Sequence, residues 1–83
     1  MATTNKNEEG RIIMEMQYVE SSNLRAIGYD PDVAILAIEF NDGSAYEYYD
    51  VPQYEFDGLA SAESKGKYAY ANIYKRYRQQ KIS

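Results

Sequence analysis

A tight-turn signature lies between two alternating runs near the middle of the chain, and it restricts the fold more than any other feature. Asn41-Asp42-Gly43 has the residue types that the favoured hairpin turns require. The run before it, 33–40, is apolar on both faces, which is typical of a central strand or of a strand covered by a partner. The run after it, 44–51, alternates tyrosine with other residues, as a half-buried strand does. The sequence therefore predicts an antiparallel hairpin at the centre of the protein.

Two further strands are predicted before this hairpin. Residues 12–19 alternate with a period of two, which indicates a strand, and their methionines leave a helix open as the alternative. Ser21-Ser22-Asn23 interrupts the pattern, and residues 24–29 form the next predicted strand. Asp30-Pro31-Asp32 then predicts a turn, because proline fixes φ and aspartate accepts local backbone hydrogen bonds.

Two helices are predicted after the strands. Pro52 ends the last strand and can begin a helix over 52–62. Ser64 is a candidate N-cap for a second helix over 65–79. The residues expected to face inward are Tyr54, Leu59 and Ala62 on the first helix, and Tyr70, Ile73, Tyr74 and Tyr77 on the second.

These elements together predict an α+β fold. We expect a small antiparallel β-meander of three or four strands, followed by two short helices packed on one face. Residues 1–10 are predicted to be a disordered N-terminal arm, and residues 11–83 a single domain. A chain of this length buries a modest core, so homo-oligomerisation stays open as a source of further stability.

The composition excludes several kinds of chemistry. The chain contains no cysteine and no histidine, which rules out disulfides and disfavours a tetrahedral zinc site. The usual nucleophile–base pairs are missing, so we expect no enzyme, no catalytic residue, no metal and no cofactor. The longest apolar run, 33–38, is far shorter than the roughly 20 residues of a membrane helix. The lack of cysteine and of an apolar leader segment predicts a cytoplasmic protein.

Charge is divided unevenly along the chain, although the total is only −4. All thirteen acids precede Ser64, whereas residues 64–83 contain six basic side chains, four tyrosines and no acid. A basic segment with interleaved aromatic residues indicates a binding surface, while the acidic total argues against indiscriminate binding to nucleic acid. We therefore expect the binding surface to involve residues 64–83.

Ser64-Lys65-Gly66-Lys67 is the first candidate site. The N-terminus of a helix offers free backbone N–H groups and a partial positive charge, which suit a phosphate or a carboxylate. Gly66 lets a ligand approach the backbone, and a bound anion would offset two lysines that oppose the helix dipole. The alternative is that both lysines are exposed and that Ser64 only caps the helix. The spacing is not that of a Walker A loop.

The spacing of the ten tyrosines separates structural residues from ligand candidates. Packing is expected for those at strand or helix spacing, which are Tyr46, Tyr48, Tyr70 and Tyr74. The candidates for stacking on a base lie near predicted turns or element ends, and they are Tyr29, Tyr49 and Tyr68. A tyrosine-rich surface suits a protein–protein interface equally well.

Two weaker candidates complete the set. The basic side chains of Lys75, Arg76, Arg78 and Lys81 are best explained as a solvated helix end, with contact to an acidic subunit or to phosphates as alternatives. Ser21-Ser22-Asn23, together with Arg25, either lines a polar pocket or only satisfies its own backbone.

Several motifs in order resemble the KTSC domain family. They are the run 19–30, then Leu36-x-Ile38-x-Phe40-x-x-Gly43-x-x-Tyr46-x-Tyr48-x-x-Val51-Pro52, and then Ala62-x-Ser64-x-Gly66-x-Tyr68 with Ile73 and Tyr77. The family includes a domain at the C-terminus of some lysyl-tRNA synthetases and small stand-alone proteins of bacteria and phages. The resemblance implies a strand-then-helix module with no established enzymatic activity. It also implies that a family-level site would lie at Ser64-x-Gly66 and at Ser21-Ser22.

Three hypotheses about function follow. The first is a non-enzymatic bacterial or phage module that captures an anionic ligand, such as a nucleotide or a nucleotide-derived signal, for example to sequester a host defence signal. Its ligand-binding residues would be Ser64, Lys65, Gly66, Lys67, Tyr68, Arg76, Ser21, Ser22, Arg25 and Tyr29. The second is a module that contacts itself or a host protein through a tyrosine-rich surface. The third is RNA binding through the C-terminal basic helix.

Overall fold

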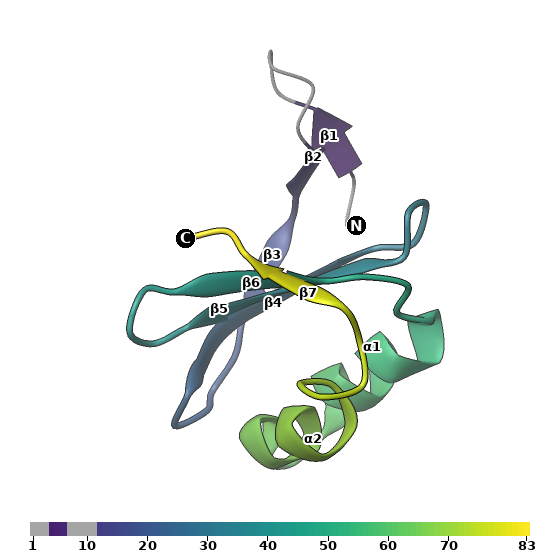
Figure 1. Ribbon diagram of the computed structural model, residues 1–83. Coiled ribbons are helices and arrows are strands. Elements are labelled where there is room, and N and C mark those ends of the chain that lie inside the picture. Colours follow the sequence, from purple (N-terminus) through teal and green to yellow (C-terminus); the bar gives the residue numbers. More distant parts are fainter. Residues whose placement is uncertain (1–3, 7–11) are drawn as a thin grey trace.

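A five-stranded antiparallel sheet carries both helices on one of its faces (Figure 1). The computed structural model describes residues 4–6 and 12–83. The sheet has the order β3-β4-β5-β6-β7, and its strands are β3 (Met16–Tyr18), β4 (Leu24–Asp30), β5 (Ile35–Phe40), β6 (Ala45–Tyr48) and β7 (Gln79–Lys81). The helices are α1 (Gln53–Ser61) and α2 (Lys65–Asn72). The predicted α+β class, with a meander and two helices on one face, is confirmed.

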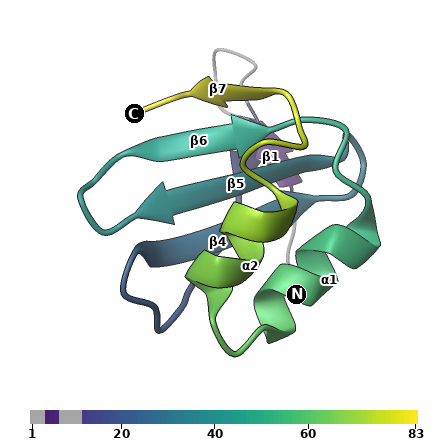
Figure 2. The ribbon, with the colours of Figure 1, turned by 60° about the horizontal axis from the view of Figure 1, so that its bottom comes forward.

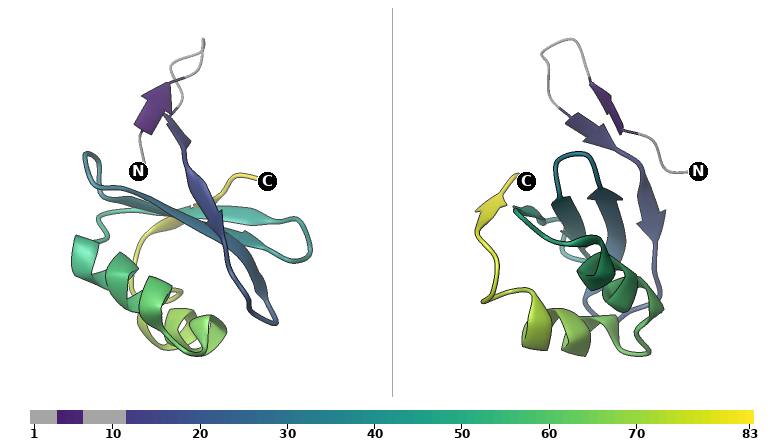
Figure 3. Two further views of the ribbon diagram at one scale, coloured as in Figure 1. Left: turned by 180° about the vertical axis from the view of Figure 1, so that it is seen from behind. Right: turned by 90° about the vertical axis from the view of Figure 1, so that its right-hand side faces the viewer.

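The N-terminal part forms a separate two-stranded ribbon. β1 (Thr4–Lys6) pairs with β2 (Ile12–Met14) in antiparallel register, and the ribbon projects away from the sheet (Figure 3). The arm over 1–10 that the sequence predicts to be disordered includes Thr4–Lys6, which form β1. The rest of that arm lies outside the described residues.

The central hairpin forms as its sequence predicts. β5 and β6 pair in register from Leu36 opposite Tyr48 to Glu39 opposite Ala45. Gly43 has a φ of 93°, a conformation that glycine adopts without steric cost, and its N–H donates to the carbonyl of Phe40 at 3.0 Å. The carboxylate of Asp42 accepts from the backbone N–H of Ser44 at 3.0 Å. The turn is therefore held by its own side chains.

The turn at Asp30-Pro31-Asp32 is also confirmed, and it shortens the strand that follows. Asp30 accepts from the backbone N–H of Asp32 at 3.0 Å. Ala34 then adopts a φ of 57°, so β5 begins at Ile35 and not at Val33 as predicted. The carbonyl of Ala34 accepts from the N–H of Val51 at 2.9 Å. This bond ties the turn to the chain that leads into α1.

The core lies between the sheet and the helices. Figure 2 shows the helices in front of the sheet. Alternate residues of β4 and β5 supply its sheet side, and the helical layer supplies the other side. Its fully buried large side chains include Leu24, Ile27, Leu36, Ile38, Val51, Leu59 and Ile73. Burial of each such side chain stabilises the fold by about 1.5–3 kcal/mol.

The second helix ends earlier than predicted, and a fifth strand follows it. α2 stops at Asn72, because the N–H groups of Ile73 and Tyr74 both donate to the carbonyl of Ala69 and the regular ladder ends there. The chain then turns back, and β7 pairs with β6 along the sheet edge. Helical spacing in the sequence gave no sign of this pairing, since the ladder depends on backbone contacts between residues far apart in the chain.

Two of the predicted inward-facing tyrosines are in fact exposed. Tyr54 is 71% exposed and Tyr70 is 66% exposed, whereas Leu59 and Ile73 are buried as predicted. On α1 the inward position belongs instead to Glu55, which is 4% exposed. Its carboxylate accepts hydrogen bonds from the hydroxyls of Tyr68 on α2 and of Tyr77 before β7. Glu55 therefore joins three segments of the helical layer.

Replacing Tyr77 by phenylalanine tests this role. We expect Tyr77→Phe to lower the free energy of unfolding by about 1.5–3 kcal/mol, because a hydrogen bond to a buried carboxylate is lost. Tyr70→Phe is the matched control and should change stability little, since its ring is largely exposed. Urea denaturation of both variants measures the difference. Equal stability of the two variants would contradict the role given to Glu55.

Candidate functional site

The start of α2 lies against the turn between β3 and β4. A Cβ built on Gly66 would lie 3.5 Å from the side-chain nitrogen of Asn23 and 4.0 Å from the hydroxyl of Ser21. The two segments that the family resemblance implied as a site, Ser21-Ser22 and Ser64-x-Gly66, are therefore neighbours in space. They are separated by about forty residues in the sequence.

Hydrogen bonds hold the β3–β4 turn in place. The hydroxyl of Ser21 accepts from the N–H groups of Asn23 and Leu24, at 3.3 and 3.2 Å. The side chain of Asn41, in the central hairpin, donates to the carbonyls of Ser21 and Ser22 at 3.3 and 3.0 Å. The hydroxyl of Ser21 is thus engaged within its own turn, and the side chain of Ser22 is exposed.

A hollow of about 470 Å³ opens beside this turn, and we call it the aromatic hollow. Its floor consists of Phe40, Tyr46 and Tyr74, from β5, β6 and the residues after α2. Its rim is polar and is formed by Ser22, Asn23, Asn41, Asp42 and Ser44. The volume falls within the range of about 300–1,000 Å³ that small-molecule sites occupy.

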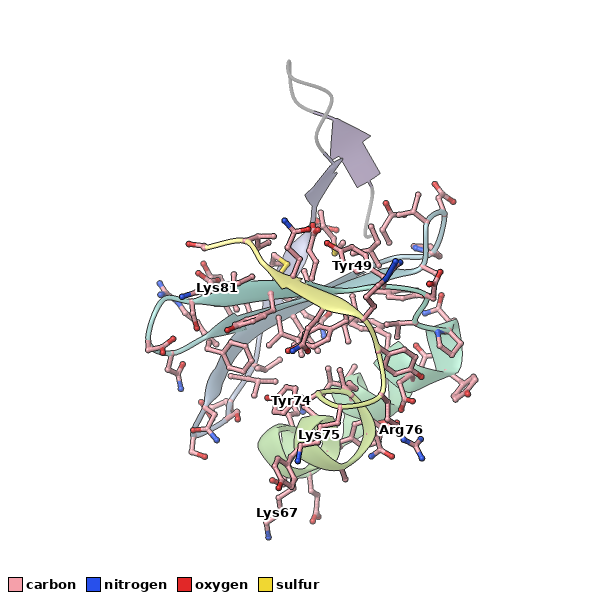
Figure 4. All side chains as sticks on the ribbon, in the orientation of Figure 1. Tyr49, Lys67, Tyr74, Lys75, Arg76 and Lys81 are labelled. Atoms are coloured by element: carbon pink, nitrogen blue, oxygen red, sulfur yellow. The ribbon has the colours of Figure 1, made fainter. Side chains whose placement is uncertain are left out.

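The aromatic floor is held by ring contacts. Phe40 meets Tyr46 edge to face at a centroid distance of 5.9 Å, and it meets Tyr74 at 6.0 Å. Tyr48 stacks beneath them on Tyr74 at 6.2 Å and is 2% exposed. Figure 4 shows Tyr74 between the end of α2 and the sheet. Each ring of the floor thus contacts another ring, while Phe40, Tyr46 and Tyr74 stay partly exposed and line the hollow.

The two ends of the aromatic hollow differ in charge. Hydrogen bonds from Ser44 lower the pKa of Asp42, so the hairpin end carries a negative charge at neutral pH. At the opposite end the side chain of Asn23 lies next to Gly66, at the start of α2, whereas the side chain of Lys67 projects from α2 away from the sheet (Figure 4). An anionic ligand in this hollow would place its charge at the α2 end.

The structure gives the residues at the start of α2 mixed roles. Ser64 caps the helix as predicted, since its hydroxyl accepts from the N–H of Lys67 at 3.3 Å. The ammonium of Lys65 donates to the carbonyl of Ala62 at 3.0 Å, which caps the end of α1. Lys67 is exposed. Of the two lysines in the first turn of α2, Lys65 makes a structural contact and Lys67 has its side chain in solvent.

Three of the predicted ligand residues lie elsewhere. Tyr29 is buried in the core, where it donates to the carbonyl of Val51 and stacks on Phe56 at 5.2 Å. Arg25 is exposed on β4 and does not line the aromatic hollow. Arg76 lies beside Tyr77, on the other side of the helical layer (Figure 4). We therefore leave all three out of the candidate site.

Tyr68 also has a structural contact rather than a free hydroxyl. The Cβ of an alanine at position 58 would overlap the hydroxyl of Tyr68, so Gly58 allows Tyr68 to reach Glu55. The hydrogen bond to Glu55, with burial, raises the pKa of Tyr68 to about 12. Burial, with a second hydrogen bond to Glu55, raises the pKa of Tyr77 to about 12.

The C-terminal basic residues do not form a helix end, because α2 stops before them. Lys75 lies over the ring of Tyr70 at 5.7 Å, and Arg78 lies over the ring of Tyr49 at 5.2 Å. Arg78 also approaches Asp50 at 3.5 Å. Lys81 is in β7 at the sheet, whereas Lys75 lies beside the end of α2 (Figure 4). These side chains are thus dispersed over several surfaces.

Sequence reasoning missed the aromatic hollow because it assigned the floor residues to the core. Phe40, Tyr46 and Tyr48 do share one face of the hairpin, as their alternation predicts. Their spacing could not reveal that this face extends beyond the helical layer at one end. The polar rim was found only in part, through Ser22 and Asn23.

Metal and membrane chemistry receive no support from the described residues. Within residues 4–6 and 12–83, no three acidic side chains gather in a way that could hold a metal ion. No helix in that part of the chain is long and apolar enough to span a membrane.

Comparison with known proteins identifies the family. The sequence model of the KTSC domain family matches residues 20–77. The chain belongs to the KTSC domain family. The match runs from the β3–β4 turn to Tyr77, so this KTSC domain includes the aromatic hollow, the start of α2 and the Glu55 contacts.

Relatives and a solved structure agree with this assignment. A protein of Tsukamurella paurometabola is 48% identical over 63 residues, which is 76% of this chain and 94% of that protein. A crystal structure of a KTSC domain protein from Yersinia pestis has a TM-score of 0.80 and 38% identity, and it covers 86% of this chain and all of that one. A lysine–tRNA ligase of Nostoc sp. is 36% identical over 64 residues, which is 77% of this chain but only 11% of the ligase.

Alkaline pH should separate the two Glu55-bonded tyrosines from the exposed ones. The pKa values of Tyr68 and Tyr77 are raised from 10.0 to about 12 in the folded protein. Their stabilisation is therefore complete below about pH 10, falls as the pH rises above that value, and is lost as the pH passes about 12. We expect the urea midpoint to fall across this window.

The double variant Tyr68→Phe/Tyr77→Phe should start with a lower urea midpoint near pH 8 and lose less of it by about pH 12. Tyr54→Phe/Tyr70→Phe is the control and should follow the wild-type pH profile. A pH profile of the first variant that parallels the wild type would show that Glu55 does not hold these phenols.

Proposed function

We propose that this KTSC domain is a non-enzymatic module that binds a nucleotide-like anion. The base would lie on Phe40, Tyr46 and Tyr74 in the aromatic hollow, and the phosphate would lie at the start of α2. The observation that carries the proposal is the aromatic hollow itself, with its aromatic floor, polar rim and connection through Asn23 to Gly66. Aromatic faces suit the bases, and polar groups suit the ribose hydroxyls.

Charge supports this orientation of the ligand. Asp42 disfavours a phosphate at the hairpin end, and Lys67 with the N-terminus of α2 favours one at the other end. The first turn of α2 contains no acid that would compete for its N–H groups. In this proposal Ser22, Asn23 and Gly66 contact the ligand, and Lys67 adds positive charge to the first turn of α2. Ser21, Ser64, Lys65 and Tyr68 hold the surrounding structure.

The proposed cellular location and effect are based on the composition of the chain and on ligand binding. A cysteine-free chain suits a reducing compartment, so we assign the domain to the cytoplasm. A small binding module without catalytic groups acts by holding its ligand. We therefore propose sequestration of a nucleotide-derived signal, such as one used in defence against phages, as its cellular effect.

A protein-interaction role is the second proposal, and exposed tyrosines favour it. Tyr54 and Tyr70 both project from the helical layer, and tyrosine is enriched at the energetic centres of interfaces. The RNA hypothesis depended on a basic helix over 65–79. Since α2 ends at Asn72 and the basic side chains are dispersed, we do not carry that hypothesis further.

Isothermal titration calorimetry with mononucleotides and cyclic nucleotides tests the nucleotide proposal. We expect saturable binding of at least one nucleotide and much weaker binding of the matching phosphate-free nucleoside. Asn23→Asp should weaken binding at least about tenfold, since it adds a negative charge beside the phosphate without changing the side-chain shape. Lys67→Glu should also weaken binding.

Arg76→Glu is the matched control for Lys67→Glu, because it makes the same change of charge beside Tyr77 and away from the aromatic hollow. It should leave the affinity within about threefold of the wild type. The nucleotide proposal is falsified if no member of the panel binds, or if Arg76→Glu and Lys67→Glu weaken binding equally.

A further inference from the structure

The face of the sheet opposite the helices carries a second, unrelated surface. Met14, Met16, Ala45 and Ile82 are among the residues that line a hollow of about 250 Å³ on this side, and we call it the sheet-face hollow. Ile82 is 49% exposed. Both helices lie on the opposite face (Figures 1 and 3), so they leave this apolar surface uncovered.

Two methionines, Met14 and Met16, line one side of the sheet-face hollow. A Cβ on Gly28 would come within 2.6 Å of the sulfur of Met16 and within 3.1 Å of the sulfur of Met14. The absence of a side chain at Gly28 therefore lets both methionines close over β4. Methionine side chains are flexible and adapt to the shape of an apolar partner.

The rim of the sheet-face hollow is acidic. Among the residues that the structure describes, Glu39 on β5 and Glu47 on β6 line it, and no lysine or arginine does. Alternation along β7 places Lys81 opposite Tyr46, whose side chain faces the helical layer, so Lys81 lies away from this rim. An apolar floor with an acidic rim is complementary to a segment that is apolar on one side and basic on the other.

The charge of the rim also decides against a second copy on the same face. A two-fold contact would bring Glu39 and Glu47 of one copy toward those of the other, and like charges at an interface are unfavourable. The basic residues 64–83 of another copy could only make a head-to-tail contact, which gives either a ring or a growing chain of molecules.

We propose that the sheet-face hollow docks a basic amphipathic segment of another protein. The apolar side of that segment packs on Met14, Met16 and Ile82, and its basic side pairs with Glu39 and Glu47. This surface is independent of the aromatic hollow, because it lies on the other face of the sheet and shares no residue with it.

The methionines provide a direct readout. The chain contains three methionines, so a protein labelled with carbon-13 in the methionine methyl groups gives three signals in an NMR spectrum. A helical peptide of leucine and lysine, apolar on one side, serves as the probe. We expect it to shift the signals of Met14 and Met16 in a saturable way. The matching peptide of leucine and glutamate should leave them unmoved.

Charge reversal tests the role of the rim. Glu39→Lys/Glu47→Lys should weaken binding of the basic peptide at least about tenfold. Asp57→Lys/Glu63→Lys makes the same change of net charge on exposed residues of α1 and its end, and it should preserve the affinity within about threefold. Dissociation constants come from the same methionine shifts.

Several outcomes would overturn the proposal. Unmoved Met14 and Met16 signals would do so, as would equal shifts with the basic and the acidic peptide. Equal loss of affinity in the two charge-reversal variants would show only a general effect of net charge. A mass in sedimentation that grows with protein concentration would assign this face to another copy of the chain instead.

Discussion

The helical layer depends on one buried carboxylate. Glu55 in α1 accepts hydrogen bonds from Tyr68 in α2 and from Tyr77 in the segment that leads to β7. A carboxylate that is 4% exposed is costly to bury unless its oxygens have partners. The two phenols therefore fix how α1, α2 and the C-terminal segment lie together. Their position also brings Tyr74 onto the sheet, where it completes the floor of the aromatic hollow.

The aromatic hollow is a consequence of this arrangement. α2 is short, so the helical layer leaves the hairpin end of the sheet partly uncovered. The aromatic side chains of β5 and β6 continue past the point where the helices stop, and a polar rim from two turns surrounds them. A fold that buries a modest core thereby leaves aromatic surface exposed next to a helix N-terminus. That combination underlies the nucleotide proposal.

The two faces of the sheet have opposite characters. The helical side offers aromatic rings, a helix N-terminus and dispersed basic groups, which suit an anion. The other side offers methionines under an acidic rim, which suits a basic segment. Because the two surfaces share no residue, the nucleotide proposal and the docking proposal do not exclude each other. The acidic and basic parts of the sequence do not map simply onto the two faces of the sheet. Arg78 and Lys81 belong to the basic part but lie at the sheet edge.

The sequence alone determined the local elements of this protein. Alternation and the Asn41-Asp42-Gly43 turn predicted the meander, and Pro52 and Ser64 predicted where the two helices begin, because these signals act between residues close in the chain. It also brought out Ser21-Ser22 and Ser64-x-Gly66 as the implied site, through the family resemblance.

Only the tertiary structure decided what depends on distant contacts. The pairing of β7 with β6 follows from a backbone ladder between residues about thirty positions apart, and helical spacing alone wrongly extended the second helix to residue 79. The same holds for Tyr29, which sequence placed at a turn and packing buried against Phe56. The exposure of a side chain is set by which elements cover it, and a period of two or of 3.6 residues does not contain that information.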